Sequence, residues 1–313
     1  MIPAKTNPFR GIYAATLTPF LKNGLIDEER LAEHFLSVTS EPGIAGVLCN
    51  GHAGENFLLT RKERRRVTEI AAEAIGETHI IVSGVLCEAS IEAAQHAEDA
   101  MDAGADALLV FPPFSWALSQ DADMAVTHHR AIASATGAPM MLYQAGVTSQ
   151  LAYRPEVLSK LVEISGVVGI KEGSWESNAY DRNRRLVKTI APHVDVMASG
   201  DEHLLSCFAI GSDGSLVSLA AIMPAEIVAL DRAVQDGDLE KARALHERIQ
   251  PLANAIYGTQ PSGWATPRLK ACMVLLGHWP NGSPRAPITD LPPSEISRLR
   301  LALVNAGMTG LET

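Results

Sequence analysis

Two consecutive apolar segments of the chain each end in a residue that could carry chemistry on a carbonyl compound. Lys171 is the last residue but one of the segment 167–172 (VVGIKE), and Tyr143 is the last but one of the segment 139–144 (PMMLYQ). Burial lowers the pKa of a lysine towards neutrality, which frees its amine to attack a carbonyl carbon and form a Schiff base. A tyrosine hydroxyl beside that amine can move protons to and from the carbinolamine. The alternatives are a lysine that extends to solvent and a half-buried core aromatic.

A glycine-rich loop, Gly51-His52-Ala53-Gly54-Glu55, follows the apolar segment 44–50. Backbone N–H groups of such a loop can approach and hold an anion such as a carboxylate, although a tight turn between elements would look the same. His52 has three open roles. It could act as an acid or base, donate a hydrogen bond to a substrate hydroxyl, or only pack within the loop.

Acidic and aromatic residues follow other apolar segments. Asp201, Glu202 and His203 come after the segment 195–200; a metal site is conceivable, but we interpret them as a cap of the next helix, and we expect no metal. Trp116 and Trp175 follow two further segments and are interpreted as walls of a pocket.

The elements that must position these residues alternate regularly. The expected strands are continuous apolar runs, as in a parallel sheet covered on both faces: 11–18, 44–50, 79–85, 105–111, 139–144, 167–172, 195–200 and 214–219. The expected helices between and after them are 28–38, 61–75, 89–102, 121–136, 154–163, 176–190 and 202–210. This alternation predicts an α/β fold, a (β/α)8 TIM barrel whose strand ends carry the active site. A doubly wound open sheet is disfavoured because no Gly-x-Gly-x-x-Gly turn follows the first strand.

The strand pattern stops after residue 236. Segments 238–256, 264–276 and 293–305 have helical periodicity, which is more helix than a barrel needs. We therefore predict a barrel carrying the active site over residues 1–236 and an appended C-terminal helical bundle over 237–313.

Composition narrows the function classes. A net charge of −10 without a basic stripe argues against nucleic acid as a partner. No run of about 18 apolar residues occurs, and no apolar signal core begins the chain, so we expect a cytoplasmic protein without a membrane partner. The four cysteines lack paired spacing and are expected to be buried free thiols. The cluster of arginines at 61–66 is interpreted as the solvated face of a helix that begins at a Thr60–Glu63 capping box.

Several motifs, taken in order, resemble those of one family. They are TLTPF and NGLID within 16–27, GHAGE at 51–55, LLTRKE at 58–63, AGADALLV at 103–110, LYQ at 142–144, GIKE at 169–172 and SGDE at 199–202. The chain resembles, over essentially its whole length, the dihydrodipicolinate synthase / N-acetylneuraminate lyase superfamily of pyruvate-type class I aldolases. We identify it as a divergent member.

The resemblance implies a barrel with C-terminal helices that assembles into a homotetramer. It implies Lys171 as the Schiff-base lysine for a 2-oxo acid and Tyr143 as the proton-transferring tyrosine. The substrate carboxylate would lie against the loop of Gly51, His52 and Ala53, with a main-chain contact from Leu216. No separate cofactor is implied, because the substrate itself forms the imine on the lysine.

Departures from the family pattern are equally informative. His52 occupies the position of the relay threonine, Phe114 that of a second tyrosine lent by a neighbouring subunit, and Thr148 that of the arginine that binds the second substrate's carboxylate. Gln144 replaces the asparagine of the family's Tyr-Asn motif. We therefore do not expect dihydrodipicolinate synthase activity, and we keep Thr148 only as a substrate-binding residue.

Three functions remain open. The first is a lyase that cleaves a 2-oxo acid to pyruvate by a retro-aldol step or dehydrates a 2-oxo-3-deoxy sugar acid, since both routes share the imine and enamine. The second is a hydratase-aldolase for an aromatic 2-oxo acid, favoured by Phe114, Trp116 and Trp175. The third is a protein that binds a keto acid without turnover.

Overall fold

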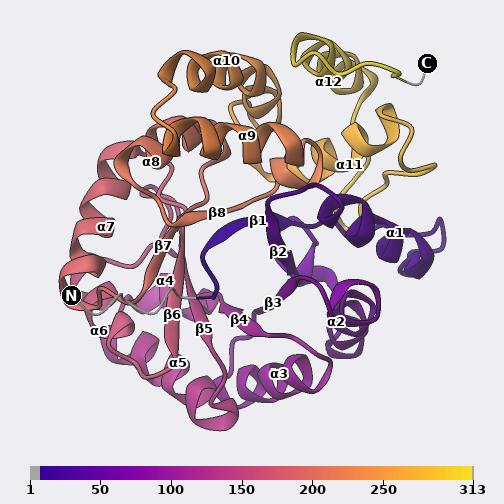
Figure 1. The fold of residues 1–313 in the computed structure, drawn as a ribbon. Helices are drawn as coiled ribbons and strands as arrows, with labels where there is room; N and C mark the ends of the chain where they lie inside the picture. The colour runs from indigo at the N-terminus through magenta and orange to yellow at the C-terminus, as the bar shows by residue number, and fades with distance from the viewer. Residues whose placement is uncertain (1–7, 312–313) are drawn as a thin grey trace.

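Eight parallel strands close into a barrel in the computed structural model, which describes residues 8–311 (Figure 1). The strands are β1 (Gly11–Ala15), β2 (Ile44–Cys49), β3 (Ile80–Val85), β4 (Ala107–Val110), β5 (Met140–Gln144), β6 (Val167–Glu172), β7 (Asp195–Ala198) and β8 (Gly214–Val217). Each strand pairs with the next along the chain, and β1 pairs with β8 to close the ring. The predicted TIM barrel is confirmed.

Helices surround the strands (Figure 1). Around the barrel lie α1 (Glu28–Thr39), α2 (Arg61–Ile75), α3 (Ser90–Asp102), α4 (Phe114–Ser119), α5 (Ala122–Thr136), α6 (Pro155–Val162), α7 (Ser177–Ile190), α8 (Leu204–Ile210) and α9 (Pro224–Gln235). Short 3-10 turns are η1 (Asn56–Leu58), η2 (Asp201–His203), η3 (Leu219–Ala221) and η4 (Ser262–Trp264). The sequence interpretation missed α4 and α9. The first is a single short segment after two prolines, and the second begins at Pro224, a residue that suits the first helical turn.

Two layers of apolar side chains lie on the two faces of the barrel sheet. Successive residues of a strand point to opposite faces, so Ile12 and Ala14 of β1 join the layer beneath the helices while Tyr13 and Ala15 join the smaller layer inside the barrel. The interior is therefore a packed core rather than a channel. The same alternation turns Tyr143 of β5 inward with Met141, at the end where the strands finish.

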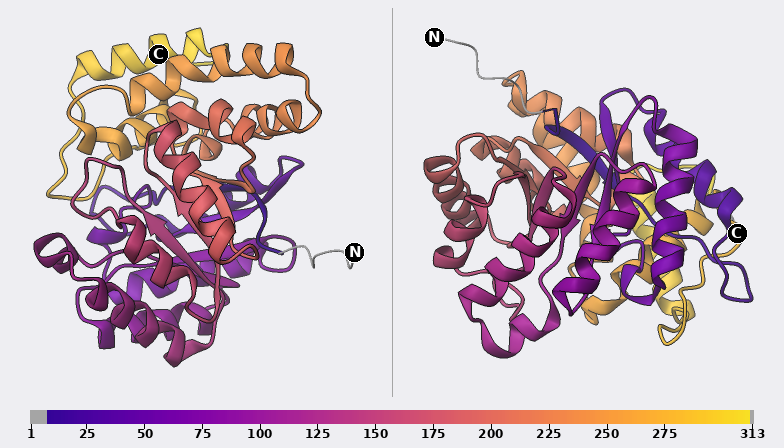
Figure 2. Two further views of the ribbon diagram at one scale, coloured as in Figure 1. Left: turned by 90° about the vertical axis from the view of Figure 1, so that its left-hand side faces the viewer. Right: turned by 90° about the horizontal axis from the view of Figure 1, so that it is seen from below.

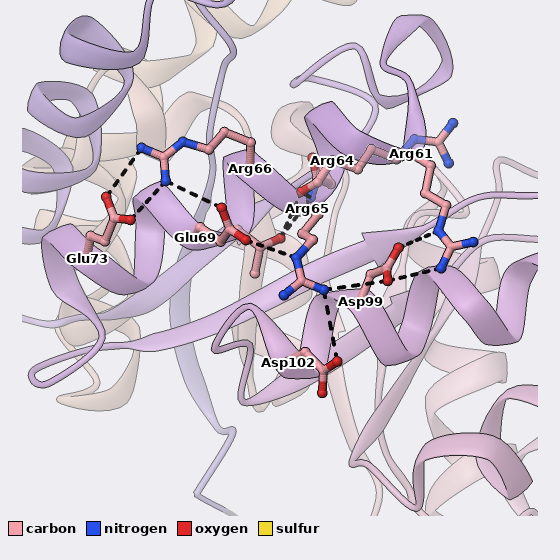
Figure 3. A network of polar contacts seen from close by, with 10 residues as sticks. Arg61, Arg64, Arg65, Arg66, Glu69, Glu73, Asp99 and Asp102 are labelled. Carbon is pink, nitrogen blue, oxygen red and sulfur yellow. Dashed lines mark hydrogen bonds and ion pairs between the residues drawn. The ribbon is translucent and has the colours of Figure 1, made fainter.

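The arginine cluster on α2 begins at the expected capping box, in which the Thr60 hydroxyl oxygen accepts from the backbone N–H of Glu63 and the Glu63 carboxylate accepts from the N–H of Thr60. Its solvated face carries a network of ion pairs that joins α2 to α3 (Figure 3). The acidic partners drawn there are Glu69, Glu73, Asp99 and Asp102. Arg64 departs from the expectation: it turns inward and donates to the Leu86 carbonyl at 2.7 Å.

The C-terminal segment folds as α10 (Leu239–Ile256), α11 (Ala265–Leu275) and α12 (Pro293–Asn305). Helix α10 packs on α9 and on α12. Helices α10, α11 and α12 lie together on one side of the barrel (Figures 1 and 2). Arg268 of α11 links this helix to α10 and α12, because its fully buried guanidinium donates to the Ile256 carbonyl at 3.0 Å and to Glu295 at 2.8 Å.

All four cysteines are buried free thiols, as predicted. Within residues 8–311, none of the helices combines the length and the apolar character that a membrane crossing would need.

Candidate active site

A cavity of about 370 Å³ opens where the barrel strands end. The barrel contributes Tyr143, Lys171, Leu216 and residues of the loops after β2, β6, β7 and β8. The C-terminal segment contributes the rest of the wall: Tyr257, Ser262, Ala265, Thr266 and Leu269. The cavity is therefore built jointly by the barrel and by the C-terminal segment.

Lys171 and Tyr143 are direct neighbours across the β5–β6 pair, where their Cα atoms are register partners. The Lys171 Nζ lies 5.9 Å from the centre of the Tyr143 ring. Only 7% of Lys171 is exposed, and burial lowers its pKa to about 8, against the opposing influence of Asp201. Burial also raises the pKa of Tyr143 to about 12, so its hydroxyl keeps its proton at neutral pH. An amine that loses its proton more easily than a free lysine thus stands beside a proton donor.

His52 faces the same cavity from the loop after β2. Its ring stacks on Phe111 with ring centres 4.4 Å apart. It lies in an edge arrangement with the Tyr143 ring, with ring centres 5.2 Å apart. Burial, reinforced by the charge of Lys171, lowers the pKa of His52 to about 4. The imidazole is therefore neutral at pH 7 and can either donate or accept a hydrogen bond.

The loop 51–55 is held from behind by a buried ion pair. Glu55 and Lys270 are both fully buried and pair with each other, and Glu55 also accepts the backbone N–H of Arg285 at 2.9 Å. Glu55 adopts a left-handed backbone conformation with φ of 56°, which its partners hold in place. Because Lys270 belongs to α11, the C-terminal segment fixes the loop that carries His52 and Ala53.

Asp201 is a cavity residue that the sequence interpretation assigned wrongly. It does not cap α8; one carboxylate oxygen accepts the backbone N–H of Leu219 at 2.8 Å, and the side chain lines the cavity with Lys171. Only 4% of the residue is exposed, and burial raises its pKa to about 7, against the influence of that N–H and of Lys171. Its position as a polar residue just beyond β7 was the only feature of the sequence that could have indicated a place in the cavity.

The aromatic residues divide into those that reach the cavity and those that do not. Trp175 lines it, as predicted, with its ring 5.1 Å from that of Tyr257. The prediction that Trp116 walls the pocket is wrong: this side chain is fully buried and packs on Tyr153 at 5.2 Å. Phe114 begins α4 and is 63% exposed.

The remaining predicted residues lie as follows. Ala53 and Leu216 line the cavity with His52. Gly51 is buried at the base of the loop, where an added Cβ would meet the Leu48 side chain. Thr148 is exposed in the turn after β5 and is not part of the cavity lining. Sequence reasoning missed Ser199, Ser218 and the wall from the C-terminal segment, which no local motif marks.

Away from this cavity, Cys87, Glu92 and His96 form the one cluster within residues 8–311 whose potential metal-ligand atoms lie within 4.8 Å of one another. The Arg64 guanidinium lies 3.0 Å from His96 Nδ1, so a fixed positive charge already occupies this position. The cluster is a poor cation site.

The similarity to known proteins extends over nearly the whole chain. The sequence pattern of the dihydrodipicolinate synthetase family matches residues 8–305. The chain is 28% identical over 303 residues to 4-hydroxy-tetrahydrodipicolinate synthase of Syntrophus aciditrophicus, covering 96% of this chain and 100% of the relative. It is 31% identical to the synthase of Methanopyrus kandleri, covering 95% and 96%. The crystal structure of dihydrodipicolinate synthase from Agrobacterium tumefaciens superposes with a TM-score of 0.87 at 26% identity, covering 96% and 99%.

The fold and these relatives together define a lyase of the class I aldolase type. The chain belongs to the dihydrodipicolinate synthetase family. Identities near 30% agree with the expectation of a divergent member.

Proposed function

We propose that this lyase forms a Schiff base between Lys171 and a 2-oxo acid. The observation that carries the proposal is the buried amine at the end of β6, inside a cavity and beside Tyr143. Desolvation makes the amine nucleophilic near neutral pH, and Tyr143 moves protons between nitrogen and oxygen. Retro-aldol cleavage converts the resulting iminium into an enamine, and loss of water proceeds through an enamine that forms when the same iminium loses a proton from C3.

The preferred substrate class is a 2-oxo-3-deoxy sugar acid. Its carboxylate would bind the backbone of the loop 51–53, and the neutral His52 ring would hydrogen-bond a substrate hydroxyl. The hydroxyls of Ser199, Ser218 and Thr266 suit a polyhydroxylated chain. No arginine of residues 8–311 lines the cavity, which supports the expectation that a substrate with a distal carboxylate, as in the synthase reaction, is disfavoured.

A hydratase-aldolase for an aromatic 2-oxo acid is the second candidate, favoured by the Trp175–Tyr257 pair in the cavity wall. The support expected from Trp116 is gone, because its ring is buried elsewhere. A keto-acid-binding protein without turnover is the third, motivated by the missing threonine of the family relay.

A turnover panel separates these functions. We would offer 2-oxo-3-deoxy acids of five and six carbons and 4-aryl-4-hydroxy-2-oxobutanoates, with pyruvate release and loss of water as the two readouts. Turnover of the sugar acids alone supports the first proposal, and turnover of the aryl compounds supports the second. Formation of a lysine adduct without any turnover would favour the binding protein, and absence of both would contradict all three.

Replacement Tyr143→Phe removes the hydroxyl while keeping the ring that packs on His52 and Phe111. We expect kcat to fall by about 10²–10⁴-fold, because general acid–base help from one side chain is of that size. The reduced adduct with pyruvate should still form, only more slowly. A kcat within about threefold of the wild type would remove Tyr143 from the mechanism.

We further propose that the protein acts as a cytoplasmic homotetramer, as the family resemblance suggests. Light scattering at micromolar concentration measures the mass directly.

A further inference from the structure

Lys171 and Asp201 occupy the catalytic cavity together, and both are almost completely buried. One Asp201 oxygen is held by the Leu219 N–H at 2.8 Å, which fixes the carboxyl group in the wall. No second lysine and no arginine of residues 8–311 lines this cavity. Asp201 is therefore the acid that shares the enclosed space with the reactive amine.

Schiff-base formation has a proton requirement that this pair meets. The neutral amine attacks C2 of the 2-oxo acid, the N–C2 bond forms, and the C2–O bond later breaks as water leaves. One hydrogen of that water comes from the amine nitrogen, and the second must come from an acid. The product is an iminium, whose positive charge needs a counter-ion in a desolvated site.

We propose that Asp201 is the acid paired with Lys171 in this cavity, and that it supplies the proton that the departing water takes up during imine formation. With the proton on Asp201 the amine is free to attack. After the proton leaves, the Asp201 carboxylate and the iminium occupy the same cavity, so its net charge is unchanged from start to finish. This role rests on the proposed Schiff-base function. Asp201 would supply the proton in place of the family's threonine relay, which this chain lacks.

The surrounding ionisable groups leave this role to Asp201. His52 on the β2 loop is neutral, since burial and the charge of Lys171 lower its pKa to about 4. Tyr143 on β5 and Tyr257 after α10 keep their protons, because burial raises both pKa values. Glu202, beside Asp201 on η2, disfavours a second negative charge there. The two tyrosines can relay a proton, but they stay neutral and so do not provide the negative charge that balances the iminium.

A bell-shaped pH profile is the expected signature. Below about pH 7 both groups hold protons and the amine is blocked; above about pH 8 both have lost them and no acid remains. The rate of imine formation with pyruvate, measured by rapid quenching into borohydride and intact mass, should peak between these limits. A wild-type rate that still rises at pH 9 would overturn the proposal without any variant.

The variant Asp201→Asn should lose the descending limb and form the adduct about 100-fold more slowly at its plateau. Asp201→Glu should restore a bell-shaped profile. Glu202→Gln, the same charge change one residue away and outside this cavity, should keep both limbs and shift only the acidic limb to lower pH, because Glu202 helps to raise the pKa of Asp201. An Asp201→Asn profile identical to wild type would overturn the role of Asp201 alone. Absence of any adduct in the wild type would instead overturn the Schiff-base function and this inference with it.

Discussion

Replacement Lys171→Met is expected to lower turnover by more than about 10³-fold, because no other lysine lines the cavity among the described residues to form the imine. Methionine retains the length and packing of the side chain. Lys171→Arg is expected to be equally inactive, since a guanidinium stays protonated and does not attack carbonyls. Turnover is measured on whichever acid the panel identifies.

The same replacement should not weaken the fold. Burial holds the pKa of Lys171 below that of a free lysine, so below about pH 8 the folded state bears the cost of a desolvated ammonium. We therefore expect Lys171→Met to melt at or above the wild-type Tm at pH 7. Lys160→Met, which replaces an exposed lysine on α6, is the matched control and should leave both turnover and Tm unchanged. Retention of activity in Lys171→Met would contradict the mechanism.

Replacement Lys270→Met is expected to destabilise the protein by about 3–5 kcal/mol, because it leaves the Glu55 carboxylate buried and without its charge partner. The Lys270 ammonium also lies 4.1 Å from the Phe20 ring centre, a cation–π contact that is lost. Urea unfolding followed by circular dichroism measures the change. Because Glu55 holds the loop of His52 and Ala53, KM should rise as well.

A double-mutant cycle isolates the pair. Glu55→Gln/Lys270→Met should be less destabilised than the sum of the single variants, since neither charge is then left alone. Arg185→Ala, which breaks the exposed Arg185–Asp181 pair on α7, should cost less than about 1 kcal/mol. Strictly additive effects at Glu55 and Lys270 would contradict a coupled buried pair.

The barrel was predictable because its strands are continuous apolar runs separated by amphipathic helices. The expected segment 167–172 coincides with β6, and α2 begins at its capping box as the Thr60–Glu63 spacing indicated. Strand ends were less accurate: β1 ends at Ala15, where the expected segment ran to residue 18. Thr16, Leu17 and Thr18 beyond the strand are just as buried as the strand itself, so a run of buried residues does not mark the last pairing.

The polar half of the cavity was harder to predict. Lys171 and Tyr143 were recognisable because each ends an apolar strand, and strand register then makes them neighbours. The local sequence around Asp201 is typical of a helix cap. Only the long-range hydrogen bond from the Leu219 N–H directs its side chain to the cavity. Tyr257 lies more than eighty residues beyond β6, and nothing in its local sequence shows that it meets Trp175.

Reduction of the protein with borohydride in the presence of pyruvate, followed by peptide mass mapping, tests the central claim most directly. The account predicts one covalent adduct per chain, located on Lys171 and absent from Lys171→Met. A lysine adduct elsewhere, or none with pyruvate or any other 2-oxo acid tried, would contradict it.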